Sequence, residues 1–78
     1  MSVSVIVLNW NGLKFISECI QSVLDQTYSE IELVVIDNAS TDRSVDLVKR
    51  NFPQVHLIEN PFNVGFSKAI NQGIAALS

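Results

Sequence analysis

The chain alternates two hydrophobic patterns, one typical of buried strands and the other of amphipathic helices. Nearly continuous apolar runs at 3–8 and 31–36 predict strands that are buried on both faces. A shorter run at 55–59 predicts a third strand. Apolar residues that recur at spacings of three and four predict helices over 13–25 and 65–77.

The segment between the second and third strands predicts one more helix. Val45, Val48 and Phe52 place an apolar stripe on one side of it. Ser40 is expected to cap its start, and Pro53 ends it because proline cannot continue a helix. The predicted order is therefore βαβαβα, with short connections throughout.

Right-handed crossovers then predict the architecture. We expect an α/β fold of three α/β/α layers, built on a parallel sheet in the order 3-2-1. The first two helices would cover one face of the sheet and the helix over 65–77 the other. This order leaves the outer edge of the strand at 3–8 unpaired, and a complete domain normally covers so apolar an edge. The chain therefore has the features of one half of a larger domain.

Two of the predicted strands end in polar, amide-rich turns. Residues 9–12 are Asn-Trp-Asn-Gly, and residues 37–42 are Asp-Asn-Ala-Ser-Thr-Asp. Because the carboxyl ends of neighbouring parallel strands face one crevice, both turns should line the same ligand site. An indole ring, side-chain amides and a carboxylate suit the stacking of a base and hydrogen bonds to its edge. The pattern predicts a nucleotide site.

Composition narrows the class of protein. Seventy-eight residues make at most one small domain, and 47% hydrophobic with 17% charged residues is typical of a globular chain. The net charge of −3 offers no broad basic surface, which argues against nucleic acid as a partner. The single Cys19 is expected to be a buried thiol on the apolar side of its helix. We expect a cytoplasmic chain without a membrane span, with membrane association only through other parts of the protein.

The first turn lacks the two common phosphate-binding signatures. Neither G-x-G-x-x-G nor G-x-x-x-x-G-K-[ST] occurs in the sequence. A dinucleotide-dependent dehydrogenase and a phosphate-loop NTPase are therefore disfavoured.

Four segments, in this order and spacing, together resemble the start of a family 2 glycosyltransferase with the GT-A fold. The resemblance covers essentially the whole chain. The segments are Val3-Ser4-Val5-Ile6-Val7-Leu8-Asn9-Trp10-Asn11, Ser22-Val23-Leu24-Asp25-Gln26-Thr27, Val34-Val35-Ile36-Asp37-Asn38-Ala39-Ser40-Thr41-Asp42, and Asn63-Val64-Gly65-Phe66 with Asn71-Gln72-Gly73.

The resemblance implies an activity and a set of binding residues. Family members transfer a sugar from a nucleoside diphosphate donor with inversion, assisted by a divalent metal, Mg²⁺ or Mn²⁺, and a carboxylate base. Trp10 would stack on or flank the base, Asn38 would meet the base edge, and Asp37 would support the same pocket. The nucleotide-sugar-binding positions that the resemblance implies are Leu8, Asn9, Trp10, Asp37, Asn38 and Lys68.

Two departures from the family pattern bear on the donor. Many members have a second Asp where Asn38 stands, and many have an Arg where this chain has Ile70. The Asp37-Asn38 form is similar to a rhamnosyltransferase-like subset, which implies a dTDP-rhamnose or UDP-hexose donor and a glycan or lipid-linked acceptor. Without that Arg, Lys68 is the remaining cation near a diphosphate, aided by the start of its helix.

The resemblance implies metal ligands and a catalytic base at positions that follow the third helix of the family. The resemblance places an Asp-x-Asp motif after the third helix, and no Asp-x-Asp occurs in these 78 residues. We therefore expect residues 1–78 to be a partial GT-A domain that holds part of the donor site. Catalytic residues and metal ligands are expected outside it, and the chain alone should be inactive.

Other interpretations of the same residues stay open. A self-contained α/β module could bind a nucleotide or a protein without chemistry, whereas a receiver-like or flavodoxin-like domain would need acidic residues where Asn9 and Trp10 stand. Trp10 could plug the top of the sheet, and Lys68 could be a solvated helix charge. Other polar residues and glycines are expected to serve turns, helix capping or close packing, namely Asn11, Ser40, Asp42, Gly65 and Gly73. His56 is not expected to bind a metal, because no second ligand lies near it in the sequence.

Overall fold

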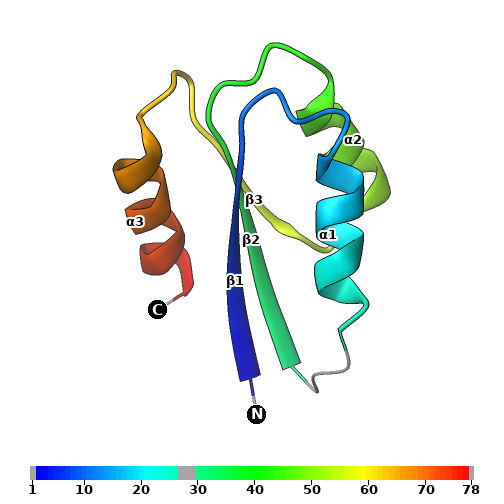
Figure 1. Ribbon diagram of the computed structural model, residues 1–78. Coiled ribbons are helices and arrows are strands. Elements are labelled where there is room, and N and C mark those ends of the chain that lie inside the picture. Colours follow the sequence, from blue (N-terminus) through cyan, green and yellow to red (C-terminus); the bar gives the residue numbers. More distant parts are fainter. Residues whose placement is uncertain (1, 27–29, 78) are drawn as a thin grey trace.

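A computed structural model describes residues 2–26 and 30–77 of the chain and shows three strands alternating with three helices (Figure 1). Thr27, part of one of the segments compared above, lies outside the described residues. The elements, in chain order, are β1 (Ser2–Asn9), α1 (Ile16–Leu24), β2 (Glu30–Asp37), α2 (Ser44–Asn51), β3 (His56–Glu59) and α3 (Phe66–Leu77).

The strands form one parallel sheet in the order β1-β2-β3. β1 pairs with β2 over its whole length, from Ser2 opposite Glu30 to Asn9 opposite Asp37. β3 pairs with the second half of β2, which brings Glu59 opposite Asp37. The predicted parallel sheet and its strand order are confirmed.

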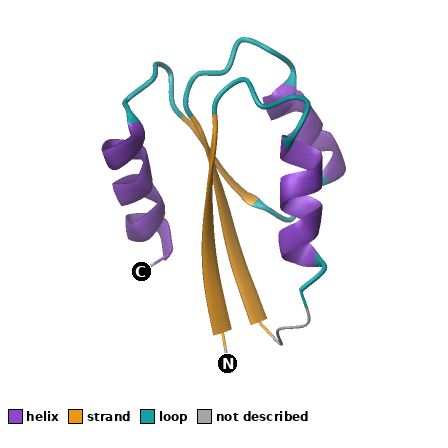
Figure 2. Cartoon of the chain, viewed as in Figure 1, coloured by secondary structure: helices purple, strands orange, loops and turns teal. Residues whose placement is uncertain are grey.

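Helices cover both faces of the sheet, as the crossover argument predicts (Figure 2). Ile16 and Ile20 of α1 and Val48 of α2 pack in one core cluster with Leu33 and Val35 of β2. On the opposite face, Ala69 of α3 packs with Val34 and Ile36. Alternate residues of β2 thus enter opposite cores, and this explains why its apolar run is continuous.

The contact between α3 and the sheet depends on a glycine. A Cβ atom added at Gly73 would lie 2.8 Å from Cγ2 of Ile6 and 3.0 Å from Cδ1 of Ile36. No larger residue fits at that distance without movement of the helix or of the two isoleucines. The predicted close-packing role of Gly73 is confirmed.

Two helices begin later than predicted because turns occupy their expected first residues. The Gly12 carbonyl accepts hydrogen bonds from the Phe15 and Ile16 N–H groups, so a turn precedes α1. α2 begins at Ser44, and Asp42 Oδ1 accepts the Ser44 N–H at 3.0 Å. The prediction that Ser40 caps this helix is wrong, whereas Asp42 does bond to its first turn.

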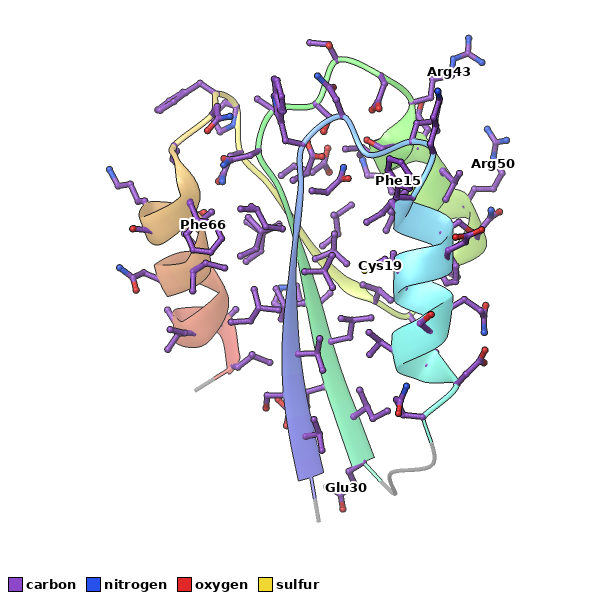
Figure 3. The ribbon with its side chains drawn as sticks, in the orientation of Figure 1. Phe15, Cys19, Glu30, Arg43, Arg50 and Phe66 are labelled. Atoms are coloured by element: carbon purple, nitrogen blue, oxygen red, sulfur yellow. The ribbon has the colours of Figure 1, made fainter. Side chains whose placement is uncertain are left out.

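The apolar stripes of α1 and α3 are only partly buried. Cys19 is exposed, so the prediction of a buried thiol is wrong. Phe66 and Ile74, expected on the apolar side of α3, are 70% and 55% exposed. Figure 3 shows Phe15 and Cys19 on one side of β1 and Phe66 on the other. Because β1 is an edge strand of this sheet, the helix surfaces beside it are left open.

Candidate functional site

The carboxyl ends of the three strands lie at the same end of the sheet, and the loops that follow them lie there together (Figure 1). The Asn38 N–H donates to the Asn9 carbonyl at 2.9 Å, and the Asn60 N–H donates to the Asp37 carbonyl at 2.9 Å. The backbone ladder therefore continues beyond the strands. It holds the residues that follow β1, β2 and β3 side by side.

A buried polar cluster joins β1 to the loop after β2. We call Asn9, Asp37, Ser40 and Ser44 the Asn9 cluster. Asn9 Nδ2 donates to Asp37 Oδ1 at 2.8 Å, to Ser44 Oγ at 2.9 Å and to Ser40 Oγ at 3.2 Å. Asp37 also accepts the Ser40 hydroxyl on Oδ1 at 2.6 Å and the Ser40 N–H on Oδ2 at 2.9 Å. These bonds offset the cost of burying the Asp37 carboxylate.

The loops after β1 and β2 are also bonded to each other near the surface. Asn11 Oδ1 accepts the N–H groups of Thr41 at 2.7 Å and Asp42 at 3.2 Å. Asn11 and Ala39 have positive φ angles of 52° and 64°, which turn the two loops toward one another. Asn11 is thus a turn residue with an unusual backbone angle, as expected, although its side chain bonds the neighbouring loop and not its own.

The Asp42 carboxylate is stabilised by donors from the start of α2 and from the turn before α1. The hydroxyl of Ser44 bonds to Asp42 Oδ1 and is the largest cause that holds the pKa of Asp42 below its ordinary value of 3.8. The N–H groups of Ser44 and Leu13 add to this effect, while partial desolvation opposes it. The carboxylate is therefore the favoured form of Asp42 in the folded chain.

Asn38 makes its own set of bonds on the other side of β2. Its Oδ1 accepts the Val64 N–H at 3.0 Å and Asn60 Nδ2 at 3.2 Å, and its Nδ2 donates to the Gly65 carbonyl at 3.4 Å. Both lone pairs of Oδ1 and one of the two Nδ2 hydrogens are therefore in use within the chain. Asn38 fixes the segment 60–65 against the end of β2.

The predicted site residues differ strongly in exposure. Asn9, Asp37 and Asn38 are at most 4% exposed, whereas Trp10 is 61% exposed. Leu8 is half-buried against the core on the α3 side, and Lys68 is exposed in the first turn of α3. A tryptophan that plugged the sheet would be buried, so the observed exposure leaves the indole free to contact a ligand.

Three residues that bond to the strand ends are not among the predicted site residues, namely Ser44, Asn60 and Gln72. Ser44 and Asn60 are buried, and each accepts or donates bonds to a predicted site residue. Asn60 directly follows β3, and Asn9 is the last residue of β1. The rule that polar residues at the ends of parallel strands meet could have identified it.

Two surface hollows flank the cluster and differ in charge. One, of about 230 Å³, is lined by Trp10 and Phe15 together with Leu8 and Cys19, and is largely apolar. The other, of about 560 Å³, lies between the loop 39–42 and residues 59–61. Four carboxylates line the second hollow: Asp37, Asp42, Asp46 and Glu59. Lys49 Nζ lies 2.9 Å from Oε2 of Glu59 and offsets part of this negative charge, and the remaining charge disfavours a diphosphate there.

Two further features concern metals and membranes. Within residues 2–26 and 30–77, no three His, Cys, Asp or Glu side chains are grouped so that they could hold a metal ion. In the same part of the chain, no helix combines the length and apolar character needed to cross a membrane.

Comparison with known proteins gives one consistent family. Residues 4–78 match the family described as Glycosyl transferase family 2. An uncharacterized glycosyltransferase of Bacillus subtilis, EpsJ, is 41% identical over 78 residues, covering 95% of this chain and 22% of the relative. An uncharacterized glycosyltransferase of Nostoc sp., alr2836, is 40% identical over 79 residues, covering 97% of this chain and 24% of the relative.

A third relative carries a more specific name. The poly(ribitol-phosphate) beta-glucosyltransferase of Bacillus spizizenii is 33% identical over 70 residues, covering 83% of this chain and 11% of the relative. The chain spans about a quarter of the length of the first curated relatives that it matches.

Proposed function

Because this chain belongs to glycosyl transferase family 2, we propose that it supplies part of the donor site of a sugar-nucleotide-dependent glycosyltransferase. The observation that carries the proposal is the exposed Trp10, held at the strand ends by the buried Asn9 cluster beside it. The exposed ring would take the base, and the bonded loops would hold the ring in place.

In this proposal the exposed and the buried site residues have different roles. Trp10 stacks on or flanks the base, and Leu8 and Asn9 at the end of β1 hold its backbone in position. Asn38 donates one Nδ2 hydrogen to the Gly65 carbonyl, and it meets the base edge through the other Nδ2 hydrogen. An acceptor role for Asn38 would require Asn60 or Val64 to release Oδ1. Asp37 supports the pocket through Asn9 and Ser40.

Lys68 is the proposed cation near the donor diphosphate. It is exposed in the first turn of α3, where the N–H groups of the helix start also favour negative charge. Its side chain is long enough to move toward a ligand. The acidic hollow lies near the α2 side of the sheet, whereas α3 covers the opposite face.

Members of this family commonly use a divalent metal. Mg²⁺ and Mn²⁺ prefer oxygen ligands, and among residues 2–26 and 30–77 no three His, Cys, Asp or Glu side chains are grouped so that they could hold an ion. We propose that the metal ligands, and the base that accepts the proton of the acceptor, come from other parts of the whole protein. Residues 1–78 alone should then transfer no sugar, a prediction that an assay of sugar transfer with Mn²⁺ present can check.

For the whole protein we propose transfer from a dTDP-rhamnose or UDP-hexose donor to a glycan or lipid-linked acceptor. The Asp37-Asn38 sequence supports the rhamnosyltransferase-like type, and the relative named as a beta-glucosyltransferase supports the hexose type. In either case the bond from the anomeric carbon to the diphosphate breaks as the acceptor oxygen bonds to that carbon. The donor diphosphate leaves, and the acceptor proton passes to a base.

Replacing Trp10 by alanine tests the base-stacking role. Trp10→Ala should weaken the binding of UDP or dTDP by about 1–2 kcal/mol, the value of one lost base stack, and calorimetric titration measures it. The fold should be kept because the ring is 61% exposed. Phe62→Ala removes a ring that is similarly exposed, at 66%, and serves as the control.

The same titration separates the enzyme from the non-catalytic module. A folded Trp10→Ala variant with unchanged UDP and dTDP affinity would show that the ring takes no part in binding. Binding of UDP by the whole protein with no sugar transfer to any acceptor would favour a binding module without chemistry.

A further inference from the structure

A row of three side-chain amides connects the end of β2 to α3. Asn60 Nδ2 donates to Asn38 Oδ1 at 3.2 Å and to Gln72 Oε1 at 2.8 Å, and Gln72 Nε2 donates to Asn60 Oδ1 at 2.9 Å. We call Asn38, Asn60 and Gln72 the amide relay. Its members come from the loop after β2, the turn after β3 and the second turn of α3.

Backbone groups fix the direction of every amide in the relay. The Val64 N–H can only donate and the Gly65 carbonyl can only accept, so Asn38 must turn Oδ1 to Val64 and Nδ2 to Gly65. Asn60 must then offer Nδ2 to Asn38, and Gln72 must present Nε2 to Asn60 Oδ1. Reversing one amide would oppose two acceptors or two donors in a buried place.

We propose that Asn60 and Gln72 are positioning residues for the donor site, an inference that rests on the function proposed above. Through the amide relay they hold Asn38 and the segment 60–65 in one arrangement. Gln72 lies four positions after Lys68, on the same side of α3. By holding α3 in place, the relay therefore also fixes the position of the Lys68 backbone relative to the strand ends. Neither residue touches the nucleotide itself.

The variant Gln72→Glu tests the relay because it keeps the size of the side chain and changes only its hydrogen bonding. An ionised carboxylate accepts from Asn60 Nδ2 but faces Asn60 Oδ1 with a second acceptor. A protonated carboxyl donates to Asn60 Oδ1 and restores the pair. We expect UDP affinity about fivefold weaker than that of the unaltered chain at pH 7.5, recovering toward it at pH 5.

The matched control is Gln54→Glu, which makes the same charge change at an exposed position outside the relay. Asp37 and Glu59, which flank Asn38 and Asn60 in the sequence, are the same in every variant, so this control accounts for their effect. Gln72→Leu should lose affinity at both pH values. Wild-type affinity in a folded Gln72→Leu chain would overturn the proposal.

A nuclear magnetic resonance measurement tests the relay without any nucleotide. In Gln72→Glu the Val64 amide signal should shift with the ionisation of the introduced carboxyl, and it should not do so in Gln54→Glu. If the unaltered whole protein binds neither UDP nor dTDP, the proposed function fails, while the Val64 signal still tests the relay. If it binds UDP and Gln72→Glu binds equally at both pH values, the relay fails and the proposed function stands.

Discussion

Ala39 holds a backbone angle that glycine adopts at lower cost. Its φ of 64° lies in the left-handed region, which costs a residue with a Cβ about 1–2 kcal/mol. Ala39→Gly removes this strain but raises the conformational entropy of the unfolded chain. We therefore expect a net gain of about 0.5 kcal/mol in the free energy of unfolding. Urea denaturation measures it.

The control for this substitution is Ala75→Gly within α3. There the same change should lower the free energy of unfolding by up to about 1 kcal/mol, because glycine disfavours a helix. Equal losses at both positions would contradict the strained angle at Ala39.

Asp42 makes the stability of the chain depend on pH in the acid range. Its folded pKa is lower than the ordinary 3.8, so its contribution is complete above about pH 4 and is lost as the pH falls through the folded value. Asp42→Asn should therefore unfold at lower urea concentration than the unaltered chain at pH 6, with a smaller difference at pH 2.5. An equal difference at both pH values would show that the ionised form is not what stabilises the turn.

At the scale of single residues, the sequence predicts which side chains reach the strand ends but not what they do there. Asn9, Asp37 and Asn38 lie where the strand pattern placed them. That they are buried and bonded to Ser40, Ser44 and Asn60 depends on pairings between distant parts of the chain, which no local pattern contains. The prediction for Cys19 was wrong for a similar reason, because its side of α1 meets no described neighbour that buries it.

Among the elements, α3 depends most on one residue. Gly73→Ala should lower the free energy of unfolding by about 1–3 kcal/mol, because the added methyl meets Ile6 and Ile36 at 2.8–3.0 Å. This loss should outweigh the gain in helix propensity. Ser67→Ala, at an exposed position of the same helix, should change stability by less than about 0.5 kcal/mol. Thermal unfolding of the two variants compares them, and a Gly73→Ala chain as stable as the parent would contradict this packing.

Strands were predicted to within one residue and helix starts less closely. The apolar run of β2 is largely buried and that of β1 is half-buried, and both are long, so their extent is visible in the sequence. The starts of α1 and α2 depend on the positive φ of Asn11 and on the bonds of Asp42, and such turn geometry is set by the facing loop. The predicted start of α3 was one residue early.

For the whole molecule, the open surfaces beside β1 predict self-association. Phe15 and Phe66 are each 70% exposed on either side of this edge strand (Figure 3). The outer N–H and C=O groups of an edge strand can pair with another chain. The double variant Phe15→Lys with Phe66→Lys should shift the chain toward monomer in sedimentation experiments. Phe62→Lys, in the turn after β3, should shift it less. A parent chain that sediments as a monomer at every concentration would contradict this expectation.

The bonds of Asn9 also carry a consequence for the order of folding. Its three acceptors lie 28, 31 and 35 residues away in the sequence, so none of these bonds can form before a strand, a helix and the next strand have come together. Asn9→Ala should accordingly speed unfolding while it leaves the refolding rate nearly unchanged. The strand ends would then be the last part of the chain to reach their native structure. A collapsed folding intermediate would therefore contain Trp10 but not yet the loops that hold it in place.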